Sequence, residues 1–254
     1  MREFTIRSVA EFVELLHDLG SQPEHPTSFR GQTTSCALYP TLTRPGGPAA
    51  GASREGLVHA EQKLLDEFRR RVPKQDFERS DYWETAILGR HHGLPTRLLD
   101  WTELPIIALF FAVTLAPDEA PRDSGASEPQ GLVFGTHGER FFMHELAERV
   151  GAAPWELKDE EPKLFIPDFR DERIFPQRSV LSVWRDPTQP FEKVSSAVWR
   201  FDVPADCHRQ IRRELDGLGI SAELLFPDLD GAARYLTWKA TEEEWARRRT
   251  RSSR

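Results

Sequence analysis

The sequence predicts a single-domain α+β fold, with a helix-rich first half and a mostly antiparallel sheet from the second half. In the first half, apolar residues recur mainly at helical spacing, whereas short β-prone runs dominate the second half. Helices and strands do not alternate regularly, as they would around a doubly wound parallel sheet. We therefore expect one α+β domain without internal repeats.

The composition is that of a globular protein. The chain has 254 residues, of which 39% are hydrophobic, and seven tryptophans, enough to build a sizeable core. Its formal net charge of -7 provides no general attraction for nucleic acid, although a local basic patch could still bind it. Two cysteines, Cys36 and Cys207, cannot make a disulfide framework. With no apolar run that could cross a bilayer, we expect a cytoplasmic protein that does not engage a membrane.

Apolar periodicity predicts the helices of the first half. Ser8 is suited to cap the first helix, and Glu11 completes a capping-box pattern. The fourth helix follows Pro105 and is apolar on all sides, so we expect it to be buried. The predicted helices span residues 8–19, 55–71, 80–92 and 104–115.

The remaining segments are predicted as strands, loops and two further helices. The alternation of Val198-Trp-Arg-Phe-Asp-Val203 is the clearest strand pattern. Strands are predicted at residues 27–31, 131–136, 179–184 and 198–203, helices at 206–218 and from 241, and loops at 43–53 and 116–130. We divide the chain into a helical lead-in (1–26), a main domain (27–240) and a charged tail that frays (241–254).

Polar side chains are concentrated in one segment, at the point where the chain enters its core. The segment is Leu88-Gly-Arg-His-His-Gly-Leu-Pro-Thr-Arg-Leu-Leu-Asp-Trp-Thr102. His91 and His92 end a predicted helix and could act as a general base or contact phosphate. Alternatively, one caps the helix and the other packs. Adjacent histidines do not share a helix face, and no HxxxH or CxxC spacing occurs, so we expect no metal.

Four residues that follow the histidines are stronger candidates. Arg97 and Asp100 are spaced to pair on one helical face, and such a pair holds a guanidinium rigid for an anion. Thr96 belongs to the same group of polar candidates. Trp101 offers a surface for stacking, although a core tryptophan is the commoner case.

Arg30 lies between Phe29 and Gly31 at the end of a predicted strand. An arginine before a glycine can reach a phosphate that approaches the backbone closely, although an internal salt bridge would also explain it. We expect Arg30, His92, Arg97 and Asp100 to converge in one pocket.

The other polar candidates have simpler explanations. Arg173 and Gln177 would lie one helical turn apart, where a solvated face is the default. Glu61 falls on the polar side of its predicted helix and is most simply a surface charge. Asp228 and Asp230 suit a turn and a helix cap.

These blocks together resemble the FRG domain family. Phe29-Arg-Gly-Gln32 with Leu38-Tyr-Pro-Thr-Leu-Thr-Arg44 looks like the motif for which the family is named, and His91–Thr102 is similar to its second block. Arg173–Gln177 and Gly219–Gly231 resemble later blocks, so the resemblance extends the domain over residues 27–240. One departure is Gln177-Arg-Ser-Val-Leu181, where the family pattern leads us to expect Gln-Gln-Gly.

The order of these blocks is in turn similar to that of ADP-ribosyltransferases, in which an early Arg or His anchors NAD⁺. That resemblance implies NAD⁺ as cofactor, with Arg30 on the pyrophosphate or ribose and Glu61 or Gln177 orienting the nicotinamide ribose. The implied catalytic residues are Arg30, His92, Glu61 and Gln177, and the implied NAD⁺ contacts are Arg30, Gln32, His91, Thr96, Arg97, Asp100 and Trp101.

Three classes of function remain open. The first is an NAD⁺-using transferase or glycohydrolase, possible as a toxin or a phage-defence effector, with an unidentified acceptor and a possible regulatory protein partner. The second is a non-catalytic module that binds a nucleotide or a protein. The third is an enzyme directed at nucleic acid, against which the acidic balance counts.

Overall fold

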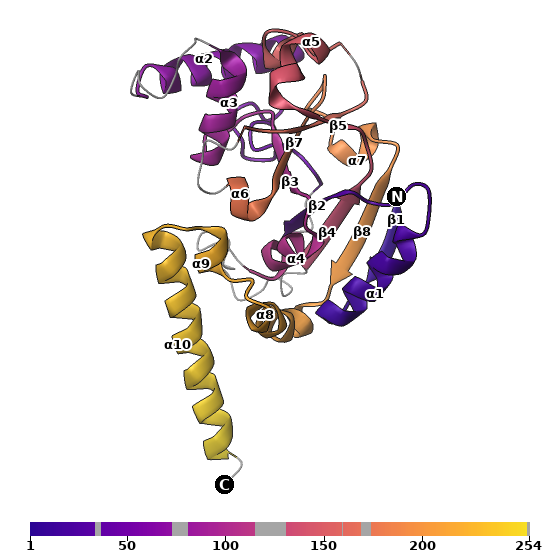
Figure 1. Cartoon of the computed structure of the whole chain (residues 1–254). Helices are drawn as coiled ribbons and strands as arrows, with labels where there is room; N and C mark the ends of the chain where they lie inside the picture. Colours follow the sequence, from indigo (N-terminus) through magenta and orange to yellow (C-terminus); the bar gives the residue numbers. More distant parts are fainter. Residues whose placement is uncertain (34–36, 73–80, 115–130, 159, 169–173, 253–254) are drawn as a thin grey trace.

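The computed structural model describes residues 1–33, 37–72, 81–114, 131–158, 160–168 and 174–252. The predicted loop at 116–130, Cys36 and Arg173 lie outside this part of the chain. The expected α+β fold is confirmed: helices pack around one open, mostly antiparallel sheet (Figure 1).

The sheet has eight strands in the order β1-β8-β4-β2-β3-β7-β6-β5. Neighbouring strands are antiparallel except at the β1/β8 and β5/β6 pairs, which are parallel. The strands are β1 (Arg2–Thr5), β2 (Ser28–Gln32), β3 (Leu99–Thr102), β4 (Gly131–Thr136), β5 (Arg140–Phe142), β6 (Lys163–Ile166), β7 (Ser179–Val183) and β8 (Val198–Val203). Strands from the first half of the chain thus occupy one edge and the centre of the sheet.

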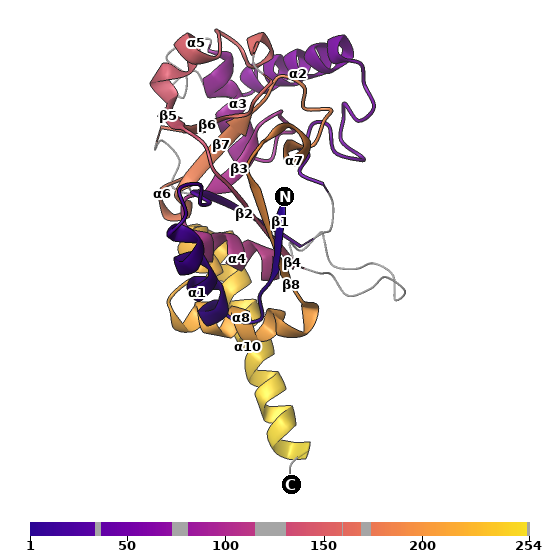
Figure 2. The same cartoon turned by 90° about the vertical axis from the view of Figure 1, so that its right-hand side faces the viewer.

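Helices cover the sheet and carry the chain between its strands. The α-helices are α1 (Val9–Gly20), α2 (Arg54–Arg69), α3 (Tyr82–His91), α4 (Pro105–Val113), α5 (Leu146–Arg149), α6 (Ile174–Gln177), α7 (Phe191–Val194), α8 (His208–Gly217), α9 (Ala222–Leu225) and α10 (Leu229–Ser252). Short 3₁₀ turns are η3 (Met143–Glu145), η4 (Pro154–Glu156) and η5 (Ala205–Cys207). The two views show α10 extending away from the rest of the molecule to the C-terminus (Figures 1 and 2).

Several predicted elements are confirmed with the expected local chemistry. Ser8 caps α1 by accepting a hydrogen bond from the backbone N–H of Glu11 at 3.1 Å. Helix α4 is buried on most of its surface, as its uniformly apolar sequence predicts. Strands β4 and β8 have the predicted bounds.

Three differences affect the site. The structure places Asp100 and Trp101 in strand β3, which pairs with β7, and not on a helical face. The helix predicted from residue 241 begins at Leu229, so the boundary at 241 falls inside α10. The lead-in at 1–26 contains a strand, β1, which pairs with β8.

The sheet has apolar cores on both faces because its strands alternate. In β4, Val133 packs with α1, α4 and α8, whereas Leu132 and Phe134 pack with the cluster around α3 and β7. This double coverage explains why the strand reads as a nearly continuous apolar run.

Gly31 in β2 is required by the close approach of α4. A Cβ atom added there would lie 1.8 Å from the carbonyl oxygen of Ala108. Only glycine lets the helix backbone lie this near the strand. The contact, which also involves the backbone N of Ala112, fixes α4 against the residue that follows Arg30.

Candidate functional site

A cavity with a volume of about 950 Å³ lies in the described part of the chain. Its walls come from β2, β3, the C-terminal end of α3, α4, α6 and the segment from α8 to α10. The strands contribute their polar residues at one end, and α8 and α10 contribute arginines and an aromatic ring at the other.

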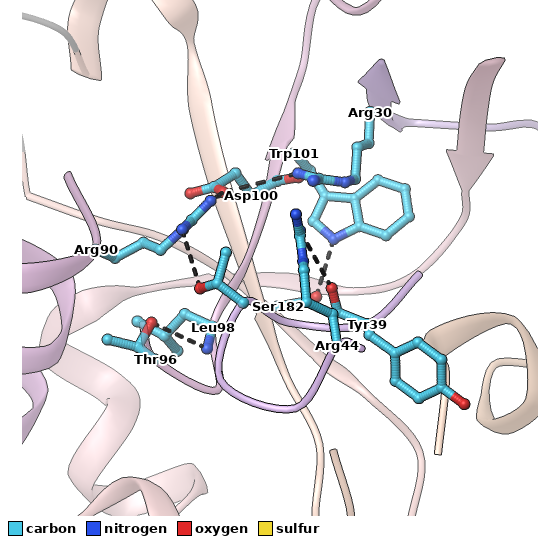
Figure 3. A network of polar contacts seen from close by, with 10 residues as sticks. Arg30, Tyr39, Arg44, Arg90, Thr96, Leu98, Asp100, Trp101 and Ser182 are labelled. Atoms are coloured by element: carbon cyan, nitrogen blue, oxygen red, sulfur yellow. Dashed lines mark hydrogen bonds and ion pairs between the residues drawn. The ribbon is translucent and has the colours of Figure 1, made fainter. Parts of the chain in front are cut away.

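At the strand end of the cavity, one carboxylate holds two arginines. Asp100 Oδ2 accepts hydrogen bonds from Arg90 Nε, at 2.8 Å, and from Arg90 Nη2. Arg30 Nη1 donates to the backbone carbonyl of Asp100 at 2.9 Å and lies 3.7 Å from the same Oδ2. Figure 3 shows Asp100 between these two side chains, which come from α3 and β2. We call these three residues the Asp100 cluster.

The cluster keeps Asp100 ionised. Burial alone would raise the pKa of the Asp100 carboxyl, but the charge and hydrogen bonds of Arg90, with smaller effects of Arg30 and His91, outweigh it. The pKa of Asp100 therefore lies below its ordinary value. Asp100 in turn raises the pKa of Arg90 against the opposing effect of burial.

Neighbouring contacts fix the backbone of the cluster. Trp101 Nε1 donates to Ser182 Oγ at 2.9 Å, and the Trp101 ring packs against Phe191 at a centroid distance of 4.7 Å. Arg90 Nη1 also donates to Thr41 Oγ1 at 3.2 Å. Trp101 is 3% exposed, so it serves mainly as a core residue that also lines the cavity.

Positive charge dominates the cavity wall. Among the described residues that line it, five are arginines and one, Asp100, is an acid; the arginines are Arg30, Arg44, Arg90, Arg212 and Arg234. The whole chain is acidic, with a formal net charge of -7. The basic residues are thus concentrated where a ligand could enter.

The wall from α8 to α10 pairs arginines with aromatic rings. The Arg212 guanidinium lies 4.7 Å from the ring centroid of Trp238, and that of Arg234 lies 5.2 Å from the ring centroid of Phe226. All four residues line the cavity. Sequence reasoning missed them because α8 and α10 are remote in sequence from His91 and His92. The available signal was Phe226 after α9 and the aromatic and basic residues of α10.

Six of the residues expected at the site do line this cavity: Arg30, Gln32, His91, Asp100, Trp101 and Gln177. Gln177 Nε2 donates to the carbonyl of Leu225 at 2.9 Å and so ties α6 to α9. Its backbone carbonyl accepts from Thr102 Oγ1 at 2.6 Å. The residues that the sequence separates most widely, Arg30 and Gln177, thus meet at one cavity.

The other four expected residues lie elsewhere. Arg97 does not pair with Asp100: its Nε donates to Glu61 Oε2 at 2.6 Å, and the two side chains are 2% and 0% exposed. Glu61 is therefore a buried residue, not the surface charge that its helix pattern indicated. Thr96 is also buried, and its hydroxyl accepts from the N–H of Leu98. His92 caps the C-terminus of α3 and is exposed.

The described residues contain no group of three or more His, Cys, Asp or Glu side chains arranged to hold a metal ion. Within the same ranges, no helix is both long and apolar enough to cross a bilayer.

Residues 25–120 match the family model of the FRG domain. The match covers β2, α2, α3, β3 and α4, and with them the Asp100 cluster. The α8–α10 wall lies beyond it. No curated protein and no solved structure matches the chain.

Proposed function

We propose that this chain, whose residues 25–120 match the FRG domain model, binds a nucleotide of the NAD⁺ type in the cavity and acts on its nicotinamide ribose. The observation that carries the proposal is the charge of the wall: among the lining residues that the structure describes, arginines outnumber acids five to one in an acidic protein. Concentrated guanidinium groups are typical of sites for phosphate or carboxylate.

The size and lining of the cavity support a nucleotide over a simple anion. A volume of about 950 Å³ lies near the upper end of the usual range for small-molecule sites, which suits a dinucleotide. Aromatic residues interleave with the arginines, and the partly exposed rings of Phe111, Phe226 and Trp238 can stack on a base. The aromatic lining residues are Phe29, Trp101, Phe110, Phe111, Phe226 and Trp238.

Two acceptor groups could orient a ribose. Arg90 and Arg30 approach Asp100 at Oδ2, and within the described part of the chain no hydrogen bond reaches Oδ1. Gln177 uses its Nε2 for Leu225, and within the same described residues no hydrogen bond reaches its Oε1. Ribose hydroxyls are donors and would match both oxygens.

The reaction that fits this arrangement is cleavage of the bond between C1′ of the ribose and the nicotinamide nitrogen. Nicotinamide leaves as a neutral base with the bonding electron pair, and the oxygen of water or another acceptor bonds to C1′ and loses its proton. Positive charge develops on the ribose in between. Asp100, held ionised, would stabilise that charge, and positioning would supply much of the remaining acceleration.

A second candidate is a module that binds the nucleotide without cleaving it. The observation that favours it is the pairing of the acids: Asp100 already carries two arginines, and Glu61 is buried against Arg97. Among the described lining residues, no glutamate faces the cavity.

Titration calorimetry with NAD⁺ and ADP-ribose tests binding, and chromatography of released nicotinamide tests cleavage. The Asp100→Asn variant removes the ionised carboxylate, and Arg70→Gln, at the exposed C-cap of α2, is the control. If the wild type binds NAD⁺ and releases nicotinamide, and Asp100→Asn abolishes the release, the result supports the enzyme. Binding without release supports the module. No heat at millimolar NAD⁺ from folded protein would refute both.

A further inference from the structure

The arginines at the two ends of the cavity differ in how far the protein already neutralises them. At the strand end, Arg90 and Arg30 share the carboxylate of Asp100, and Arg30 also donates to the Asp100 carbonyl. A ligand phosphate at that end would have to compete with an ionised aspartate.

At the other end, the residues that the structure describes place no carboxylate as close to Arg212 or Arg234. Within the described ranges, no carboxylate oxygen lies within 4.0 Å of either guanidinium, and each guanidinium lies over an aromatic ring instead. Stacking on a ring holds the guanidinium plane in place and leaves its N–H edge for a planar, two-point contact with an anion.

Glu242 and Asp216, the acids whose charges act on Arg212, already form ion pairs with other cationic side chains. Glu242 accepts from Arg213 Nε and forms an ion pair with Arg209, and Asp216 accepts from Lys239 Nζ at 3.1 Å. Burial lowers the pKa of Arg212 to about 10, although Glu242 and Asp216 oppose this, so the side chain is still charged at neutral pH. A partly desolvated cation gains more from a bound anion than an exposed one does.

We infer that Arg212 and Arg234 form a phosphate subsite of the cavity, on the wall from α8 to α10, that binds the pyrophosphate of a free nucleotide. The identity of the nucleotide depends on the proposed function, but the phosphate subsite itself depends only on these two side chains. On this inference, the pyrophosphate lies at this wall and the ribose at the Asp100 cluster. The family resemblance, in contrast, implies that Arg30 contacts the pyrophosphate or the ribose.

Inorganic pyrophosphate, NAD⁺ and adenosine are the probes, titrated by calorimetry against the full chain. The test variants are Arg212→Gln, Arg234→Gln and the double variant. The matched control is Arg70→Gln/Arg185→Gln, which removes the same charge from exposed ion pairs outside the cavity lining. Arg234 is exposed, so its variant is expected to fold even if Arg212→Gln does not.

We expect each single variant to bind pyrophosphate and NAD⁺ about tenfold more weakly, because each loses a charged hydrogen-bond donor. Adenosine binding should be unchanged, as should all affinities of the control. Arg212→Lys, which keeps charge but not the planar fork, should recover only part of the affinity.

The outcomes separate this inference from the proposed function. Pyrophosphate binding that the variants lose, without any NAD⁺ binding by the wild type, supports the subsite and refutes the proposed function. NAD⁺ binding that the double variant retains within twofold refutes the subsite and leaves the function standing. A wild type that binds neither probe overturns both.

Discussion

The Glu61 carboxylate and the Arg97 guanidinium form an ion pair that is closed off from solvent, with a distance of 2.6 Å between Oε2 and Nε. Glu61 Oε1 accepts from the backbone N–H of Arg97, and Arg97 Nη1 donates to the carbonyl of Pro154. The pair therefore links α2, the chain that enters β3, and η4.

Removing one partner of this pair should destabilise the fold strongly. A single substitution, Glu61→Leu or Arg97→Met, leaves a buried charge uncompensated, which costs about 3–5 kcal/mol. The double variant Glu61→Leu/Arg97→Met should lose less stability than the single variants combined. Urea unfolding measures all three. Single variants no less stable than Arg70→Ala, which breaks an exposed pair with Glu67, would contradict this role.

Asp100 should contribute to stability at neutral pH and lose that contribution in acid. Its pKa is lower in the folded protein than in the unfolded chain, so folding favours the ionised form. The contribution is complete above the unfolded pKa of about 4 and disappears as the pH falls through the folded pKa. The free energies of unfolding of wild type and Asp100→Asn should therefore converge below about pH 4. A constant difference between pH 6 and pH 2 would count against the ionic role.

Gly31→Ala should displace α4. The added Cβ would lie 1.8 Å from the Ala108 carbonyl oxygen, and neither backbone can rotate away as a flexible side chain could. We expect a loss of about 1–3 kcal/mol or more in unfolding free energy, as for overpacked cores. Gly20→Ala, where nothing lies within 4 Å of the added atom, is the control. Equal stability of the two variants would show that β2 and α4 adjust freely.

Glu242→Gln should loosen α10 more than it destabilises the whole chain. Glu242 forms ion pairs with Arg209 and Arg213 of α8 and so joins the two helices. Because these arginines are partly exposed, the expected loss in global stability is at most about 1 kcal/mol. Hydrogen exchange should speed up in α10, where Trp238 lies, and not in β4. Unchanged exchange in α10 would mean that other contacts hold the helix.

The sequence predicted those parts of the fold that local patterns specify. The cap at Ser8, the apolar run of α4 and the alternation in β8 each determine an element within a few residues. Strand β3 was missed because Leu99–Thr102 is short and lies in a polar block, where pairing with β7 and not local preference makes the strand.

The candidate site divides in the same way. The sequence by itself identified Arg30, His91, Asp100 and Gln177 as polar residues in motif blocks, and all four line the cavity. It could not identify partners, because an ion pair depends on which elements lie side by side. Only the tertiary structure determines that Asp100 pairs with Arg90 and Arg30 and that Glu61 is buried against Arg97. It also places the arginines of α8 and α10 at the cavity. Periodicity reports the environment of a residue within its own element, whereas charge pairing is decided between elements distant along the chain.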